Sequence, residues 1–287
     1  MPALAVGRRG VVVLSCLAAL AVAPRLAAAD RLALPGSHLY YEVHGEGRPM
    51  VLIHGGNLDA GMWDADVPVF ARTFRVISYD VRPYGRSGPV TPDYAWHEDL
   101  RALLDHLKIE RADLVGLSLG ARLAINFALA YPSRVDRLVL AGPGVDGWPF
   151  APDPHLPGLV GAVMARDAKK ATALWLAHPY MATAMRDPGV ATRLSELAAR
   201  NEHIWLQEIG PAVVPKPLAL TRVAEIRAPT LILVGTLDVA DIVQIADRLE
   251  RDIRGARKVV LPEIGHLVNL EAPDRFRALV TDFLSGR

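Results

Sequence analysis

The chain has 287 residues, of which 51% are apolar, and a formal net charge of +1 at pH 7. This length suits one large α/β domain or two small ones, and the apolar share can fill a sizeable core. The near balance of charge provides no basic surface, which argues against a nucleic-acid partner.

Residues 1–29 are predicted to form a secretory signal peptide that is removed. Arg8 and Arg9 give a basic start, residues 11–23 are apolar but too few to span a bilayer, and residues 27–29 are alanines suited to cleavage. The mature chain would then begin at Asp30, be periplasmic or secreted, and have no stable membrane span. An uncleaved anchor is the alternative. The arginine pair also loosely fits the twin-arginine pattern, which would mean export in the folded state.

Cys16 is the only cysteine, and it lies inside the predicted leader. The mature chain therefore has neither a disulfide nor a thiol nucleophile. It also lacks H-x-x-x-H spacing on a helix, a G-x-G-x-x-G after a strand and a P-loop. The sequence consequently predicts no metal and no cofactor.

Strand-like and helix-like segments alternate along most of the chain. The mature chain is predicted to open with turn residues from Leu32, and residues 45–47 form a hairpin-type turn. Apolar, β-rich runs predict strands at residues 38–43, 50–53, 74–79, 113–115, 137–141, 229–234 and 258–261. Helical spacing predicts helices at residues 59–71, 98–107, 121–131, 242–252 and 273–284. This alternation predicts a mostly parallel, doubly wound sheet.

The pattern breaks between residues 144 and 214, where no strand is convincing. Proline-punctuated amphipathic stretches such as 168–177 and 190–209 predict a helical insertion. We therefore expect a core of residues 30–143 and 222–287, with a helical cap of residues 144–221 inserted after the sixth strand. Aromatic residues in amphipathic helices usually pack in a core, but one or two could line a pocket. The candidates are Trp148, Trp175, Trp205, His178 and His203.

The stretch 112–131 combines a short strand, the motif G-x-S-x-G and a helix that ends before Pro132. This is the context of a nucleophile elbow, a sharp turn that projects a serine hydroxyl. Gly116 and Gly120 suit the turn because they lack Cβ. Ser118 is the candidate nucleophile, and the N–H of Leu119 at the helix start would face a developing oxyanion.

A serine hydroxyl needs a base within hydrogen-bond reach and an acid that orients the base. In the elbow architecture these follow in the order serine, aspartate, histidine. Asp238 lies just past the strand 229–234, and His266 lies between the last strand and the last helix. These two residues are the predicted acid and base. Asp241, one helical turn further on, is the rival acid.

A second oxyanion donor is expected in the loop after the strand 50–53. We choose the N–H of Gly56, with Asn57 less favoured, because a glycine pair lets the backbone come close to a substrate. His54 at the end of the same strand is interpreted as structural. In the loop 80–88, Asp80 and Arg82 are predicted to form a structural ion pair.

From Leu39 to Leu284 the sequence resembles the α/β-hydrolase superfamily. The resemblance rests on VLIHGGNLDAGMW, FRVISYDVRPYGRSG, LVGLSLGARLA, YPSRVDRLVLAGP, PTLILVGTLD and LPEIGHLVNLEAPDRF. It implies the α/β-hydrolase fold, with Ser118 as nucleophile, His266 as base, Asp238 as acid, and Gly56 and Leu119 as oxyanion donors. Within the superfamily the chain is similar to bacterial aryl-esterases, cofactor-free perhydrolases, 3-oxoadipate enol-lactonases and C–C bond hydrolases.

Two positions depart from the common pattern of that superfamily. Ala121 stands where a second glycine often follows the elbow, and Pro83 follows Arg82 where a glycine is common. A methyl group is usually tolerated at the first position, and the proline stiffens the loop at the second. The serine at the elbow argues against the dehalogenase and epoxide hydrolase members, which carry aspartate there.

These observations predict a serine hydrolase that cleaves small carboxylic esters or lactones through an acyl-enzyme. The same three residues could instead cleave a C–C or amide bond, or transfer the acyl group to an acceptor other than water, as acyltransferases and perhydrolases do. A binding protein on an inactive hydrolase scaffold would be expected to lack one of the three, and none is missing. The oligomeric state is not predicted.

Overall fold

The computed structural model describes residues 28–207 and 212–286. Residues 1–27 of the predicted leader, with Arg8, Arg9 and Cys16, lie outside the described residues. Its last two alanines, Ala28 and Ala29, begin the first strand and pair with Val43 and Glu42.

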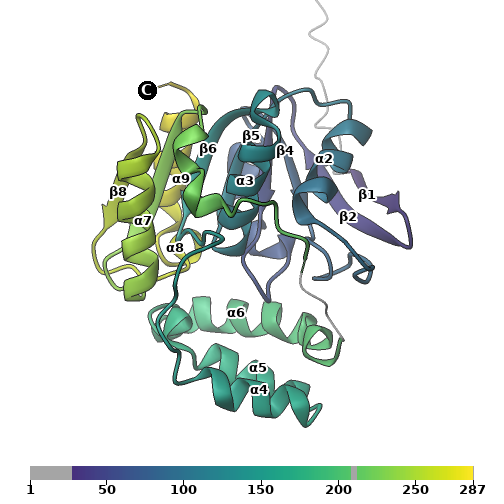
Figure 1. The fold of residues 1–287 in the computed structure, drawn as a ribbon, viewed down its shortest axis with the longest axis vertical. Helices are drawn as coiled ribbons and strands as arrows, with labels where there is room; N and C mark the ends of the chain where they lie inside the picture. Colours follow the sequence, from purple (N-terminus) through teal and green to yellow (C-terminus); the bar gives the residue numbers. More distant parts are fainter. Residues whose placement is uncertain (1–27, 208–211, 287) are drawn as a thin grey trace, which may run out of the picture.

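Eight strands form one sheet in the order β1-β2-β4-β3-β5-β6-β7-β8 (Figure 1). β1 and β2 run antiparallel to their neighbours, and all other pairs are parallel. The strands are β1 (Ala28–Leu34), β2 (Ser37–His44), β3 (Arg48–Ile53), β4 (Phe74–Tyr79), β5 (Ala112–Leu117), β6 (Val135–Ala141), β7 (Thr230–Gly235) and β8 (Arg257–Leu261). The expected mostly parallel, doubly wound sheet of the α/β-hydrolase fold is confirmed.

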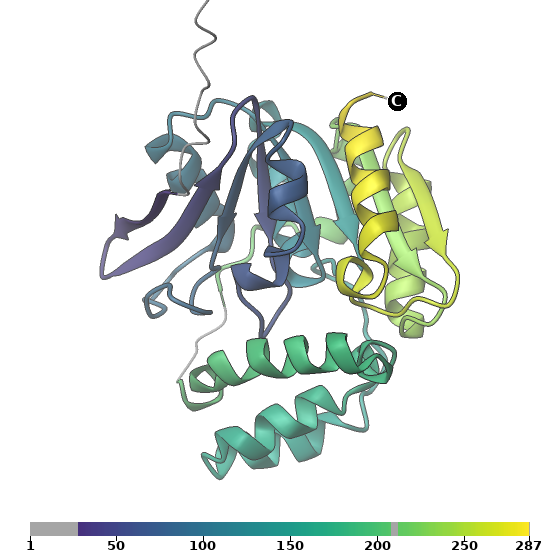
Figure 2. The same cartoon turned by 180° about the vertical axis from the view of Figure 1, so that it is seen from behind.

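Helices cover both faces of this sheet, as Figures 1 and 2 show from opposite sides. One face carries α2 (Trp96–His106), α3 (Leu119–Ala130) and α7 (Ala240–Asp252), and the other carries α1 (Val67–Phe70), α8 (Val268–Glu271) and α9 (Pro273–Leu284). Successive side chains of a strand point to opposite faces, so β3 supplies both layers. Val51 and Ile53 pack in the first hydrophobic cluster, whereas Met50 and Leu52 pack in the second.

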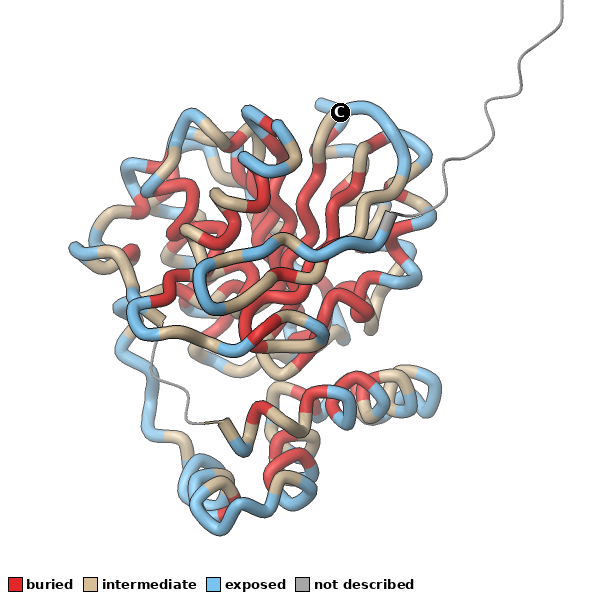
Figure 3. Tube along the Cα trace, turned by 90° about the vertical axis from the view of Figure 1, so that its right-hand side faces the viewer, coloured by how far each residue is buried: buried red, intermediate tan, exposed pale blue. Residues whose placement is uncertain are grey.

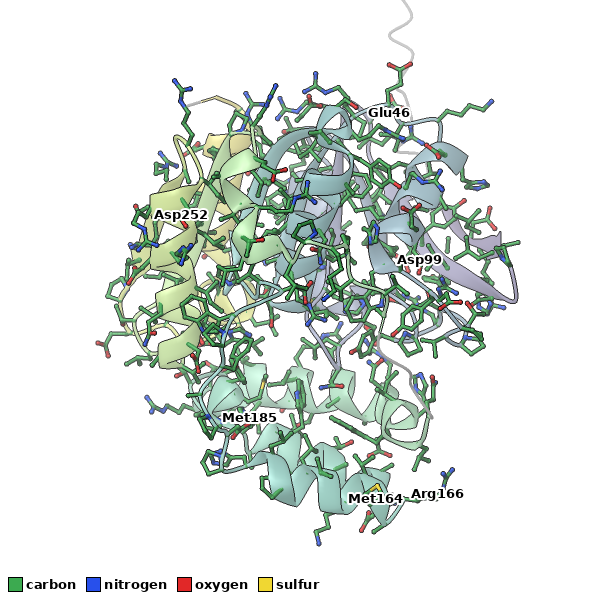
Figure 4. All side chains as sticks on the ribbon, in the orientation of Figure 1. Glu46, Asp99, Met164, Arg166, Met185 and Asp252 are labelled. Atoms are coloured by element: carbon green, nitrogen blue, oxygen red, sulfur yellow. The ribbon has the colours of Figure 1, made fainter. Side chains whose placement is uncertain are left out.

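Between β6 and β7 the chain leaves the sheet and forms α4 (Leu156–Met164), α5 (Ala168–Leu176) and α6 (Pro188–Arg200). These helices lie together beyond one edge of the core, with α6 nearest to it (Figure 1). We call these helices and the segments that join them to β6, to β7 and to one another the cap. In Figure 3 the buried positions gather in the sheet layers, and the outer cap helices carry many exposed positions. Met164 and Arg166, labelled in Figure 4, mark the far end of the cap.

The N-terminal part corrects two expectations. The segment expected to hold only turn residues from Leu32 is the end of β1, whose Leu32 and Leu34 pack against the core at period two. Residues 45–47 turn sharply but close no hairpin, because β2 pairs with β4 and not with β3. A Cβ on Gly45 would lie 2.3 Å from the Ala71 carbonyl oxygen, and its φ is 70°, so the turn requires glycine.

Two predicted helices are shorter than expected. Residues 59–71 split into a 3₁₀ turn (Ala60–Trp63) and α1, because Pro68 has no N–H with which to continue a helix from the preceding turn. The helix predicted at 190–209 begins at Pro188 and ends at Arg200. It ends there because the buried side chain of Asn201 turns back to the Leu197 carbonyl.

Candidate functional site

Ser118 forms the turn between β5 and α3. Its backbone has φ 55° and ψ −108°, a strained conformation for a residue with a Cβ. The turn is held on both sides, since the Ser118 N–H donates to the Ala141 carbonyl at 2.9 Å and its carbonyl accepts from the Arg122 N–H at 3.0 Å. The side chain is half-buried at the end of the strand.

The glycines around Ser118 are required by backbone contacts. A Cβ on Gly116 would lie 2.4 Å from the Gly120 carbonyl group, and a Cβ on Gly120 would lie 2.1 Å from the Ile53 carbonyl oxygen. Both distances are too short for any real contact, so α3 meets the ends of β3 and β5 backbone to backbone. This is the small-residue requirement that the sequence motif predicts.

Asp238 and His266 lie against each other in the loops that follow β7 and β8. The His266 Nδ1 is 2.9 Å from Oδ2 and 3.1 Å from Oδ1 of Asp238, and the exposed fractions of the two side chains are 4% and 0%. An ionised carboxylate only accepts hydrogen bonds, so Nδ1 carries the proton and Nε2 keeps a free lone pair. That is the tautomer a general base needs.

The strand β6 connects this pair to the serine turn. Gly142, the first residue after β6, lies so close to the His266 ring that a Cβ there would be 3.0 Å from Nδ1. The preceding residue, Ala141, accepts the hydrogen bond from the Ser118 amide. The structure thus brings Ser118, Asp238 and His266 to one edge of the sheet.

Whereas His266 binds Asp238, the rival acid Asp241 binds Trp148 and Ala151. Its Oδ1 accepts from the Trp148 indole N–H at 2.9 Å and its Oδ2 from the Ala151 N–H at 3.3 Å. It therefore anchors the segment that leads into the cap.

Gly56 and Leu119, the predicted oxyanion donors, are neighbours. A Cβ on Gly56 would lie 3.9 Å from that of Leu119. Within residues 28–207 and 212–286, neither backbone N–H donates to another protein group. The N–H groups of Gly56 and Leu119 stay the predicted oxyanion donors.

His54 holds the loop that carries Gly56. Its Nε2 accepts from the Val81 N–H at 2.8 Å, so its Nδ1 donates to the Gly55 carbonyl at 2.7 Å. The ring is fully buried, and burial lowers its pKa, so it stays neutral. The structural interpretation of His54 fits this geometry.

The predicted ion pair between Asp80 and Arg82 is wrong. Arg82 makes a buried two-point contact with Asp99 of α2, labelled in Figure 4, with N···O distances of 2.7 Å and 2.6 Å. Asp80 instead accepts from the Ala60 N–H at 2.8 Å and from Arg86. Residues two apart in extended backbone share a side, but the chain turns after Asp80 and sends the two side chains to different neighbours.

Glu271 was missed by sequence reasoning. This residue of α8 accepts from the Gly265 N–H at 2.7 Å and from the Leu267 N–H at 2.9 Å, the two amides that flank His266. It thereby fixes the backbone that presents the histidine, although burial still raises its own pKa. The sequence shows a glutamate five residues after the histidine. This spacing predicts the contact only once it is known that the chain enters a short helix directly after the histidine.

Tyr180 was also missed, and it is a cap residue that reaches the site. Its ring centroid lies 4.7 Å from that of His266 and 4.9 Å from that of His178. Burial is the largest of the effects that raise its pKa to about 12, so it stays protonated. Among the aromatic cap candidates, His178 touches the site through Tyr180, whereas Trp148 and Trp205 donate to Asp241 and Thr172.

Three potential metal ligands also come together in the cap, although the sequence predicted none. They are Asp153, His155 and His178, whose ligand atoms all lie within 4.8 Å of one another. The spacing rule missed them because His178 comes from a different segment of the cap.

Comparison with known proteins gives one consistent result. The family described as alpha/beta hydrolase fold matches residues 48–273. A 2-hydroxy-6-oxononadienedioate/2-hydroxy-6-oxononatrienedioate hydrolase of Paraburkholderia xenovorans is 31% identical over 266 residues, covering 86% of this chain and 90% of the relative. The enol-lactonase of Burkholderia xenovorans is similar in structure, with a TM-score of 0.74 and 26% identity. The match covers 89% of this chain and 100% of the enol-lactonase. A thermophilic esterase of Thermogutta terrifontis has a TM-score of 0.75 and 27% identity. The match covers 90% of this chain and 98% of the esterase.

No helix within the described residues is both long and apolar enough to cross a membrane.

The contact of Gly120 with β3 predicts that Gly120→Ala lowers the free energy of unfolding by about 3 kcal/mol or more, because backbone must move to admit the methyl group. Gly161→Ala in α4 is the matched control, since its Cβ would meet nothing within 4 Å. It should be neutral or stabilise by about 0.5–1 kcal/mol. Denaturant unfolding of both variants tests this, and equal effects would contradict it.

The two hydrogen bonds to Glu271 predict that Glu271→Gln lowers the free energy of unfolding by about 1–3 kcal/mol, since an amide offers one acceptor in place of two. The amides of Gly265 and Leu267 should also exchange with solvent faster. Glu263→Gln, at an exposed position in the same loop, should change neither quantity. Unchanged protection of both amides in Glu271→Gln would refute the role.

Proposed function

This chain belongs to the α/β hydrolase fold family, and we propose that it is a serine hydrolase that cleaves carboxylic esters or lactones through an acyl-enzyme. The observation that carries the proposal is the buried His266–Asp238 pair, linked through Ala141 and Gly142 to the strained turn of Ser118. Structural neighbours named as an esterase and an enol-lactonase support the ester and lactone class.

In this mechanism the Ser118 hydroxyl attacks the carbonyl carbon while the free lone pair of His266 Nε2 takes its proton. The resulting imidazolium is stabilised by Asp238, whose carboxylate contacts Nδ1 through both oxygens. His266 then gives the proton to the leaving alcohol, which breaks the ester C–O bond and leaves the acyl group on Ser118. Water, activated by the same histidine, releases the acid and restores the serine.

The negative charge of the tetrahedral intermediate would be bound by the N–H groups of Gly56 and Leu119. Neither amide donates to another protein group in the described structure, and the two residues lie beside each other next to the serine turn. The turn at Ser118 holds the Leu119 amide in position before substrate arrives. The hydrogen bonds of His54 hold the loop that carries the Gly56 amide. Such preorganised donors are worth about 3–4 kcal/mol each in the transition state of acyl transfer.

The proposal predicts that a fluorophosphonate adds once to the wild-type chain and that Ser118→Ala takes up none. The same variant should lose at least about a thousandfold in kcat with nitrophenyl esters, since the nucleophile is absent. Ser133→Ala removes an exposed serine outside the site and should keep both properties. Intact-protein mass and initial rates measure these outcomes. Ester turnover by Ser118→Ala within a few-fold of wild type would reject the assignment.

A second candidate is hydrolysis of a C–C bond, favoured by the sequence relatives. The compound named for the Paraburkholderia xenovorans relative is an oxo dicarboxylate with no ester, so its hydrolysis breaks a C–C bond. An arginine is well suited to bind a carboxylate of such a substrate, because its charge-assisted hydrogen bonds are strong. Arg122, one turn after Ser118, is such a residue: its Nε is buried without a hydrogen-bond partner in the described structure, and its Nη1 is 3.6 Å from Asp146.

If Arg122 binds a substrate carboxylate, Arg122→Met should lower kcat/KM for such a dicarboxylate by about tenfold or more, because one charge-assisted contact is lost. Turnover of a neutral nitrophenyl ester should change by less than threefold. Parallel kinetics on the two substrates measure this split. Equal losses on both would show that Arg122 supports the fold, and absence of dicarboxylate turnover in the wild type would leave ester hydrolysis as the function.

A further inference from the structure

We propose that Asp153, His155 and His178 form a zinc site in the cap, beside the candidate active site. The three residues come from two segments: the first two lie in the stretch that enters α4, and His178 lies between α5 and the 3₁₀ turn Pro179–Met181. The cap fold is therefore needed to assemble them.

The ligand atoms converge on the Asp153 carboxylate. The His178 Nε2 is 2.8 Å from Oδ2, and the His155 Nδ1 is 3.1 Å from Oδ1. All three ligand atoms lie within 4.8 Å of one another. Zinc binds imidazole nitrogens and carboxylate oxygens at about 2.0–2.2 Å, so its ligand atoms lie roughly 3–4 Å apart in a tetrahedral site. Small side-chain rotations bring this cluster to that geometry.

The cluster is held in place by contacts among its members and with Tyr180. The His155 backbone N–H donates to Asp153 Oδ1 at 2.9 Å, which fixes the carboxylate. The His178 ring stacks on Tyr180 and meets the His155 ring edge-on, with centroids 5.1 Å apart. Ligands whose orientation is set by such neighbours lose less freedom on binding a metal.

The choice of zinc follows from the ligand types and their number. Two imidazoles and one carboxylate suit a borderline ion such as Zn²⁺, whereas Mg²⁺ and Ca²⁺ prefer oxygen ligands. Three protein ligands leave one position of a tetrahedral ion for solvent. That position has space, because the cluster lines a cavity of about 560 Å³ whose other walls include Tyr180, Val239 and Asp241.

Binding changes two hydrogen bonds. In the metal-free cluster His178 Nδ1 accepts from the Tyr180 N–H at 3.3 Å, so Nε2 carries the proton that faces Asp153. Zinc takes the place of that proton at Nε2, and the proton moves through solvent to Nδ1. The long contact with the Tyr180 amide is lost, and three metal–ligand bonds replace it.

The site is close to the proposed chemistry. Tyr180 lies between His178 and His266, with ring centroids 4.9 Å and 4.7 Å away. Zinc would therefore fix the cap segment whose aromatic ring covers the proposed base. The cavity beside the cluster also reaches Val239, the residue after Asp238.

The test measures zinc directly, on the full chain without a polyhistidine tag. The protein is dialysed against buffered zinc and its metal content determined, and Co²⁺ is added separately to record the visible spectrum of a four-coordinate ion. We expect one zinc per chain in the wild type, and His155→Gln and His178→Gln to weaken binding by at least about tenfold. His44→Gln is the matched control, because His44 contacts only one carboxylate, that of Glu42, at 3.2 Å.

Retention of zinc by His44→Gln together with loss in both cap variants supports the site. A wild-type chain that holds no zinc, or equal binding in His155→Gln, overturns it. If His178→Gln does not fold, His155→Gln still decides, since that side chain is 49% exposed. The measurement needs no substrate, so its outcome is independent of the proposed hydrolase activity.

Discussion

The backbone contact between α3 and the ends of β3 and β5 is the constraint on which the site depends. Gly120 lies so close to Ile53 that no side chain fits, and Gly116 lies too close to Gly120 to carry one. This contact bends the chain sharply enough to force Ser118 into a strained conformation. It also brings Leu119 beside Gly56, so one packing constraint sets both the serine and the two free amides.

A second backbone contact positions the base and the acid. A Cβ on Gly235 would lie 2.0 Å from the Ile264 carbonyl oxygen, so the end of β7 touches the loop after β8 without intervening side chains. Asp238 lies in the loop that follows β7 and His266 in the loop that follows β8, which explains why an aspartate and a histidine 28 positions apart meet in a buried pair. Glu271 then fixes the histidine backbone from the side of α8.

Sequence reasoning succeeded where local chemistry decides and failed where distant segments decide. The elbow glycines, the parallel strands and the placement of Asp238 could be read because each depends on nearby residues and on strand order. The partners of Asp80 and Arg82 could not, because Arg82 meets Asp99 only after the loop folds onto α2. Glu271 and Tyr180 were missed for the same reason. The contacts of Glu271 form only when the chain turns into α8, and the contact of Tyr180 with His266 forms only when the cap packs on the core.

The cap meets the core in a different way from the elements of the core. Around α6 and Tyr180 its contacts are made by side chains: Arg200 and Asn201 both donate to the buried carboxylate of Asp59, and Tyr180 packs on His266. The hydrogen bonds from Arg200 hold the pKa of Asp59 below its usual value despite burial, so this junction keeps its charge. Side-chain contacts can change one at a time, whereas the glycine contacts of the elbow cannot. The core can therefore keep one arrangement of serine, histidine and aspartate. The cap forms one wall of the cavity beside them, so changes in its side chains can alter which molecules fit there.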